Sequence, residues 1–536
     1  MPVTTLLLTN ARLAGASGPA AGAAAGAAAG AAAGAAAGPV DVLLDGGRIA
    51  AVTPTGAAGA GHAVVTGDVV DLDGRTVVPG LWDAHTHLTQ WALVRHRLDV
   101  SWATSAAHAA DLVRDRLRYA AAPAGGQPLV GYGFRWATWP DQPTAELLDA
   151  VAGDVPVVLL SGDLHSAWAS TAGLRFLGIA HHPSGLLREE EWMPASPRIV
   201  TVEDDVADAL VADAARAAAA RGVVGVVDLE VDDNLTTWRR RVARGWDGLR
   251  VRAGVWEQHL DAVLDAGLRD GDPLVDPAAG PAATSDLVRQ GPLKVISDGS
   301  LNTLTAYCFD PYGGAGHDGH GGHHGQVGHA AHGVLNVETD HLVPLMARAH
   351  AAGLRCAIHA IGDRANALAL DAFAASGARG SVEHAQLLRR EDVARFAALG
   401  VTASVQPEHA MDDRDVAEEL WPGRTARAFP LAELRAAGVR LALGSDAPVA
   451  PLDPWVAVAA AVTRSRDGRE PWHPEQRIDV AAALAASTGG RPLHLAVGGP
   501  ADLAVLDVDP LAPDADLRTM PVSGTLVAGR WTHRAL

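Results

Sequence analysis

The chain contains 536 residues, of which 48% are apolar and 20% charged, and its formal net charge at pH 7 is −19. This length and apolar content are typical of a globular protein with a large core and a second module, and the negative charge disfavours nucleic acid or an anionic membrane as a partner. Only two cysteines occur, Cys308 and Cys356, which is too few for a disulfide framework and typical of a reducing compartment. Since the first residues also lack the basic start of a secretory signal, we expect a cytoplasmic protein.

The two ends of the chain share a pattern of short apolar runs separated by glycine-rich turns, which indicates β-strands. The expected strands cover residues 5–8, 40–44, 48–52, 74–78, 501–507 and 524–530. We therefore predict a small composite β-sandwich domain built from residues 1–78 and 491–536.

The Ala/Gly tract at 20–38 is about as long as a membrane span. Because Ala and Gly gain little from hydrocarbon, we interpret the tract as a low-complexity loop and expect no membrane segment.

Residues 79–490 alternate apolar, strand-like runs with Ala-rich helical stretches. Eight strands are expected at 77–87, 223–228, 249–255, 293–297, 356–359, 380–384, 402–406 and 439–444, with helices between the later ones, for example at 340–352, 366–375 and 390–399. Eight β/α units predict an α/β fold of the (β/α)8 TIM-barrel type. The stretch at about 95–200 is too long for one connection and predicts an insertion between the first two strands.

Two histidines close the first of these runs, and they are the most informative feature of the chain. In a strand, the side chains of His85 and His87 point to the same face, where they can bind one metal ion. His359, His384 and Asp446 follow, each at or just after the end of its own apolar run. Function in a TIM barrel collects at the C-terminal strand ends, and imidazole and carboxylate groups are suitable zinc ligands.

Seven segments carry a resemblance to a known family. They are PGLWDAHTHL at 79–88, LKVISDGSLNTLT at 293–305, HAIGDRA at 359–365, EHAQ at 383–386, SVQPEH at 404–409, LGSDAPV at 443–449 and GPADLAVLD at 499–507. In content and order these segments resemble amidohydrolase family 3, a branch of the amidohydrolase superfamily that includes N-substituted formamide deformylase. The resemblance implies a metal-bearing barrel together with the composite β-domain.

The resemblance also implies roles for individual residues. Its metal ligands are expected to be His85, His87, Lys294, His359, His384 and Asp446. Lys294 matches a lysine that many relatives carboxylate to N6-carboxylysine so that it bridges two metal ions, and Asp446 matches an aspartate that binds metal and transfers protons. Asp446 and Lys294 are thus the expected catalytic residues. An ion pair between Lys294 and Asp298 is the simpler alternative, so one zinc ion or two remain open.

Five further residues are predicted to contact substrate. They are His165, Asp298, Gln406, His409 and Trp136. Each also has a purely structural interpretation as a hydrogen-bonded or packed side chain.

The chemistry of these residue types predicts a zinc-dependent hydrolase. A bound Zn²⁺ lowers the pKa of water to about 7, and Asp446 can accept the proton of the attacking water and pass it to the leaving nitrogen. We expect hydrolysis of a non-peptide, amide-like C–N bond in a small-molecule substrate. The alternatives are an ester or lactone hydrolase on the same scaffold, and a non-catalytic metal-binding protein that uses the His-rich loop at 317–332. The oligomeric state, including a homo-oligomer, stays open.

Overall fold

A computed structural model describes most of the chain: residues 5–15, 38–56, 67–120, 123, 126–136, 139–162, 164, 166–200, 202–275, 286–313 and 331–536. His165, nearly all of the Ala/Gly tract and most of the His-rich loop lie outside the described residues. The chain divides into two compact units, one formed by Met1–His87 with Ala215–Leu536 and the other by Leu88–Ala214. The predicted insertion at 95–200 falls inside the second unit.

The first unit contains an eight-stranded parallel barrel, which confirms the predicted fold class. In sheet order its strands are β6 (Leu81–Thr86), β12 (Val223–Asp228), β13 (Arg250–Trp256), β14 (Val288–Ile296), β15 (Cys356–Ala360), β16 (Gly380–His384), β17 (Thr402–Val405) and β18 (Leu441–Leu443). A parallel bridge between Thr86 and Ala447 brings the first and last strands together. There the His87 N–H donates to the carbonyl of Ala447 across 2.8 Å.

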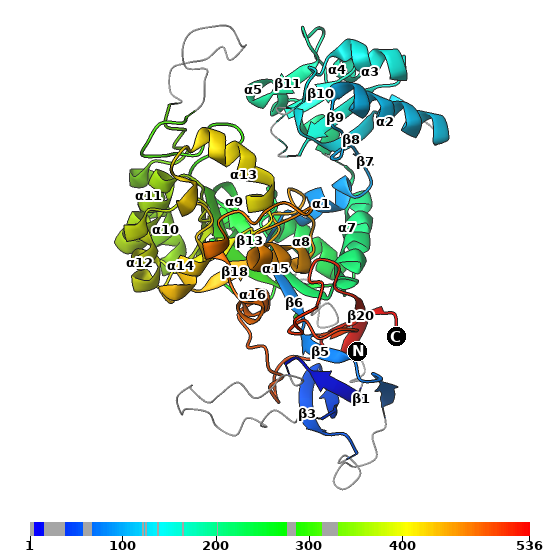
Figure 1. The fold of residues 1–536 in the computed structure, drawn as a ribbon, viewed down its shortest axis with the longest axis vertical. Coiled ribbons are helices and arrows are strands. Elements are labelled where there is room, and N and C mark those ends of the chain that lie inside the picture. Colours follow the sequence, from blue (N-terminus) through cyan, green and yellow to red (C-terminus); the bar gives the residue numbers. More distant parts are fainter. Residues whose placement is uncertain are drawn as a thin grey trace. The chain divides into compact units, whose positions relative to one another are not determined.

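The barrel strands form where the sequence has short, almost uninterrupted apolar runs, as is typical of parallel strands that are covered on both faces. Helices from the first unit pack outside them: α8 (Asn234–Ala243), α9 (Glu257–Asp265), α10 (Thr339–Ala351), α11 (Asp363–Ser376), α12 (Arg390–Leu399), α13 (His409–Leu420), α14 (Leu431–Ala436), α15 (Pro454–Thr463) and α16 (Val480–Ala486). Figure 1 shows α10, α11, α12 and α14 grouped on one side of the barrel. The helices predicted at 340–352, 366–375 and 390–399 correspond to α10, α11 and α12.

Both ends of the chain contribute strands to one connected eight-stranded sheet, in the region where the sequence predicts a composite β-sandwich domain. The strands are β1 (Leu6–Leu13), β2 (Val40–Asp45), β3 (Arg48–Pro54), β4 (Asp68–Asp71), β5 (Thr76–Pro79), β19 (Leu503–Leu506), β20 (Val522–Val527) and β21 (Arg530–Arg534). The N-terminal strand β5 pairs antiparallel with the C-terminal strand β19. One apolar core, which includes Leu8, Val42, Val77 and Val505, joins the two halves.

The second unit is built on a five-stranded sheet with the order β11-β10-β9-β8-β7. Its elements are α1 (Leu88–Val94), β7 (Leu98–Asp99), α2 (Ala106–Tyr119), β8 (Leu129–Phe134), α3 (Ala145–Ala152), β9 (Val157–Ser161), β10 (Ser166–Ala169), α4 (Thr171–Phe176), β11 (Leu186–Arg188), α5 (Glu189–Trp192) and α6 (Pro197–Val200), followed by α7 (Asp204–Ala219), whose last residues belong to the first unit. Within the parts of the chain described above, no helix combines the length and apolarity needed to cross a membrane.

Candidate metal centre

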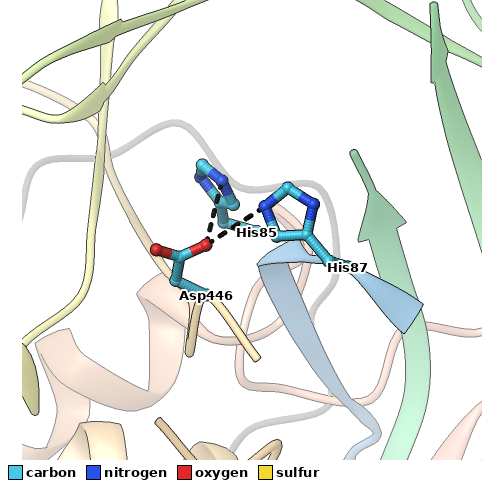
Figure 2. A group of neighbouring side chains, drawn as sticks. All are labelled: His85, His87 and Asp446. Atoms are coloured by element: carbon cyan, nitrogen blue, oxygen red, sulfur yellow. Dashed lines mark ion pairs between the residues drawn. The ribbon is translucent and has the colours of Figure 1, made fainter. Parts of the chain in front are cut away.

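Two histidines face one carboxylate at the C-terminal end of the barrel. His85 lies in β6 and His87 directly follows that strand, so both side chains project to the same side. The Nε2 atoms of His85 and His87 lie 3.4 Å and 3.3 Å from Oδ1 of Asp446. Figure 2 shows both rings beside this one oxygen atom. Three potential ligand atoms therefore converge on one small space.

The contacts that close the barrel also position Asp446. This residue follows β18 in a left-handed backbone conformation with φ 57°, and its N–H donates to the carbonyl of His85 across 2.8 Å. Beneath it, the buried Asp83 carboxylate accepts hydrogen bonds from the N–H groups of Ser445, at 2.9 Å, and His85, at 3.1 Å. Burial raises the pKa of Asp83 to about 7. Asp83 thus links the first and last strands directly below the site.

A buried carboxylate fixes the proton position on His85. Nδ1 of His85 donates to Oε2 of Glu383 across 2.8 Å, and both side chains are almost fully buried. Since an ionised carboxylate can only accept, the proton sits on Nδ1 and the Nε2 lone pair is directed towards Asp446. Burial, together with the charge of Lys294, lowers the pKa of His85 to about 4. His85 is therefore neutral, as metal coordination requires.

Lys294 projects from β14 into the same buried space. Its Nζ atom lies 3.5 Å from Nε2 of His85. Burial lowers the pKa of Lys294, although the charges of Glu383 and Asp446 oppose this effect. Lys294 is also the only lysine in the chain, and all the other residues counted as Lys or Arg are arginines. An amine, unlike a guanidinium, can lose its proton in a protein and become a nucleophile or a ligand.

A second group of ligand atoms lies on the other side of Asp446. One potential ligand atom from each of His384, His409 and Asp446 lies within 4.8 Å of the other two, and all three residues are buried. His384 ends β16 in a left-handed conformation with φ 71°. This turn breaks the strand alternation, so Glu383 and His384 both approach His85, whose ring centroid is 5.0 Å from that of His384.

His359 lies at the border of these groups. Its ring centroid is 4.5 Å from that of His384, but its Nε2 atom faces Oδ1 of Asp298 at 3.4 Å. Asp298 is fully buried and accepts hydrogen bonds from the N–H groups of Tyr307, Ile361 and Gly362 at 2.9 to 3.0 Å. Asp298 therefore holds the loop after β14 against the loop after β15, and among the described residues it forms an ion pair with His359 rather than with Lys294.

The structure thus brings together four of the six predicted ligands, namely His85, His87, His384 and Asp446, with Lys294 and His359 at their edge. It also places His409, predicted as a substrate contact, beside two of these potential ligands, His384 and Asp446. The other predicted substrate contacts are less central. Gln406 is buried after β17, Trp136 packs in the second unit with the Arg188 guanidinium 4.4 Å from its ring centroid, and His165 lies outside the described residues.

Two residues in the site were not singled out from the sequence. Asp83 stands two positions before His85, and i, i+2 alternation places Asp83 on the histidine face of β6, so a polar residue every second position was an available signal. Glu383 gave no such signal, because a strand sends Glu383 and His384 to opposite faces unless its end is distorted.

The donor set fits a divalent cation. Neutral imidazoles and a carboxylate are the ligands that zinc prefers. Nδ1 of His384 and Nε2 of His409 are buried without a hydrogen-bond partner within the described part of the chain. Burial of such atoms is costly unless another group satisfies them. Burial alone would raise the pKa of Asp446. The neighbouring histidines outweigh this effect and hold the pKa of Asp446 well below its usual range.

Comparisons with known proteins show which fold and family the chain has. The chain is 28% identical to Protein LONG AFTER FAR-RED 3 of Arabidopsis thaliana, over 78% of this chain and 74% of that protein. It is 28% identical to N-substituted formamide deformylase of Arthrobacter pascens, over 91% of this chain and 94% of that enzyme. The crystal structure of an uncharacterized metal-dependent hydrolase from Pyrococcus horikoshii OT3 has the same fold, with a TM-score of 0.75 at 23% identity, and covers 96% of this chain and 100% of that one. The family model described as amidohydrolase family matches residues 68–533, and with this match over most of its length the chain belongs to the amidohydrolase family.

Proposed function

We propose that the protein is a metal-dependent hydrolase that cleaves a non-peptide, amide-like C–N bond in a small molecule. The observation that carries this proposal is the convergence of His85 Nε2 and His87 Nε2 on Oδ1 of Asp446 at the C-terminal end of the barrel. Catalytic groups of TIM barrels lie at this end. The deformylase from Arthrobacter pascens, by its name, removes a formyl group from a substituted nitrogen, and this supports a C–N bond as the target.

The residues proposed to hold the cation are the six expected from the family: His85, His87, Lys294, His359, His384 and Asp446. Zinc is the metal we propose, because nitrogen and oxygen ligands of this kind suit it. When bound, zinc supplies Lewis acidity, which lowers the pKa of water to about 7 and polarises a carbonyl group.

Lys294 enters this proposal as N6-carboxylysine. Carboxylation requires the neutral amine, which attacks CO2 and loses a proton to give a carbamate. Burial lowers the pKa of Lys294 and so increases the neutral fraction at neutral pH. The carbamate would supply oxygen ligands in place of an ammonium group, which cannot ligate a metal.

Asp446 is the proposed proton carrier. Its carboxylate stays ionised because the neighbouring histidines hold its pKa well below the usual range, against the effect of burial. It accepts a proton as water attacks the substrate carbonyl carbon. It then delivers that proton to the leaving nitrogen as the C–N bond breaks, which gives a carboxylic acid and an amine. Glu383 keeps His85 in the tautomer that leaves Nε2 free of a proton.

The experiment is a screen of N-formyl and N-acyl amines, with the matched esters alongside, on purified protein. We expect amide hydrolysis that is lost after verified metal removal with a chelator and restored by zinc. Full activity in metal-free protein would contradict the proposal, and turnover of esters alone would favour the ester-hydrolase alternative. A version without residues 317–332 should keep its tightly bound ion and its activity, whereas a storage protein based on the His-rich loop would lose most of its metal.

Two further expectations accompany this proposal. The net charge of −19 supports a small-molecule substrate rather than nucleic acid or an anionic membrane as partner. The scarcity of cysteine supports a cytoplasmic location.

A further inference from the structure

The second unit contains a pocket that the proposed function does not use. Its volume is about 450 Å³, which is within the range of small-molecule sites in proteins. The pocket lies at the N-terminal ends of the parallel strands β7 and β8, which begin at Leu98 and Leu129, and beside Arg116 in the last turn of α2. All the residues that line it belong to the second unit.

Apolar side chains form most of the wall of this pocket. Leu93, Leu129 and Ile199 are buried, and Leu98 and Val130 are half-buried. Covering an apolar wall removes it from water and lowers the free energy by roughly 25 cal/mol for each Å² of apolar surface. The wall therefore favours a ligand with an apolar part of its own.

One guanidinium group in this lining has no protein partner. Arg97 is half-buried and lines the pocket, and among the described residues its side chain neither donates a hydrogen bond nor forms an ion pair. The neighbouring Arg95 and His96, by contrast, lie 3.3 Å and 3.7 Å from the carboxylate of Asp213. Burial lowers the pKa of Arg97 to about 10, so the group is charged at neutral pH but poorly solvated. Its planar fork of N–H donors is available to an oxyanion.

The other charged groups of the lining leave this cation without a counterion. Asp99 is the acidic residue of the described lining, and its Oδ1 atom accepts a hydrogen bond from the N–H of Ser101 across 2.9 Å. Within the part of the chain that the structure describes, no ion pair joins Asp99 to Arg97. Arg116 contributes a second guanidinium group to the lining. The charge of the pocket therefore favours an anion.

We propose that this pocket binds an amphipathic oxyanion, a small molecule that combines an apolar chain or ring with a carboxylate or phosphate group bound by Arg97. The apolar part lies against Leu98, Leu129 and Ile199, and the oxyanion accepts charge-assisted hydrogen bonds from the guanidinium group. The inference does not depend on the proposed function, because no residue of the metal centre lines the pocket. It gives the second unit a binding role of its own.

A bound molecule would connect the two ends of the second unit. Leu93 and Arg97 follow closely on Leu88, where the unit begins, whereas Ile199 and Val202 directly precede α7, in which it ends. A ligand that contacts both stretches restricts their local opening. Amide hydrogen exchange at 93–99 and 199–202 should therefore become slower when the pocket is occupied.

Calorimetric titration of the full-length protein tests the role of Arg97. The probes are decanoate and decyl phosphate, with uncharged decanamide as the control ligand. Arg97→Gln is compared with Arg114→Gln, because Arg114 is exposed on α2, pairs with Asp111 and does not line the pocket. We expect the wild type and Arg114→Gln to bind at least one of the two oxyanions equally well, and Arg97→Gln to bind it at least about 10-fold more weakly.

The relative affinities of decanoate and decyl phosphate identify the preferred head group. Equal affinity of Arg97→Gln and Arg114→Gln, equal affinity for decanamide and the oxyanions, or no binding of either oxyanion would overturn the inference.

Hydrogen exchange locates the bound probe on the unaltered chain, because a carboxylate or phosphate can also bind a metal ion. We expect decanoate or decyl phosphate to slow exchange at 93–99 and 199–202. Slower exchange confined to residues around His85, His87 and Asp446 would place the probe at the metal centre; it would overturn this inference and leave the proposed function intact. If Arg97→Gln does not fold, this measurement decides.

Discussion

Nδ1 of His85 donates a hydrogen bond to Oε2 of Glu383 across 2.8 Å, and neither side chain is more than 3% exposed. The contact joins the first barrel strand to the sixth. It also leaves the Nε2 atom of His85 available on the side where Asp446 lies. A carboxylate that orients a metal-binding imidazole in this way raises the basicity of the ligand and fixes its tautomer.

Replacement of Glu383 by Gln should therefore weaken metal binding more than it weakens the fold. The amide can still accept from Nδ1, but it carries no charge, and we expect the affinity for zinc to fall about 10- to 100-fold. Competition with a chromophoric chelator measures this. Ser381→Ala is the control, because it removes only the hydroxyl that donates to the other oxygen of Glu383. If the two variants bind zinc equally well, the Glu383 charge does not act on the site.

Lys294 allows an unusually clean test for a carbamate, because it is the only lysine among 536 residues. Protein equilibrated with ¹³C-bicarbonate should show one side-chain carbamate signal by NMR, and Lys294→Arg should lack it. Burial lowers the pKa of Lys294, so the neutral, reactive amine is present at a lower pH than for an exposed lysine. The signal should therefore persist at pH values where an ordinary lysine stays protonated. A carbamate signal that survives in Lys294→Arg would come from the N-terminal amine and count against the assignment.

A substitution at Asp446 should affect proton transfer more than metal binding. Asp446→Asn keeps the shape of the side chain and one oxygen ligand but cannot accept the proton of the attacking water. We expect kcat to fall by about 10²- to 10⁴-fold, with at least part of the zinc retained. Asp467→Asn, at an exposed position, controls for the loss of one negative charge. Activity within a few-fold of the wild type in Asp446→Asn would assign proton transfer to another group.

The barrel could be predicted from the sequence because local composition alone indicates where its strands lie. A buried parallel strand is a short apolar run, so 223–228 and 380–384 were predicted with the bounds that the structure shows. The candidate metal ligands come from the same rule, since His85, His384 and Asp446 lie at or just after the ends of such runs, and their binding of metal stays a prediction. By contrast, β4 (Asp68–Asp71) carries only two apolar residues and could not be distinguished from a turn.

The remaining features depend on contacts between distant segments. His409 lies close to His384 and Asp446, both of which have left-handed backbone, and this conformation is uncommon for residues other than glycine. Asp298 was expected to contact substrate, whereas its oxygens accept hydrogen bonds from backbone groups more than 50 residues away. That contact with substrate stays a prediction.

The Asp83 carboxylate provides a last prediction, about stability. It is buried and accepts hydrogen bonds from the N–H groups of His85 and Ser445, and so holds the two strands at which the barrel closes. Asp83→Ala leaves both buried donors unsatisfied, and we expect the free energy of unfolding to fall by about 1–3 kcal/mol for each donor left unpaired. Asp83→Asn retains one carbonyl oxygen as acceptor and should lose less. Urea denaturation of the metal-free proteins measures both changes, so that metal loss does not contribute. Equal destabilisation by Ala and Asn would contradict this prediction, because it would show that the carbonyl oxygen retained in Asn does not stabilise the closing strands.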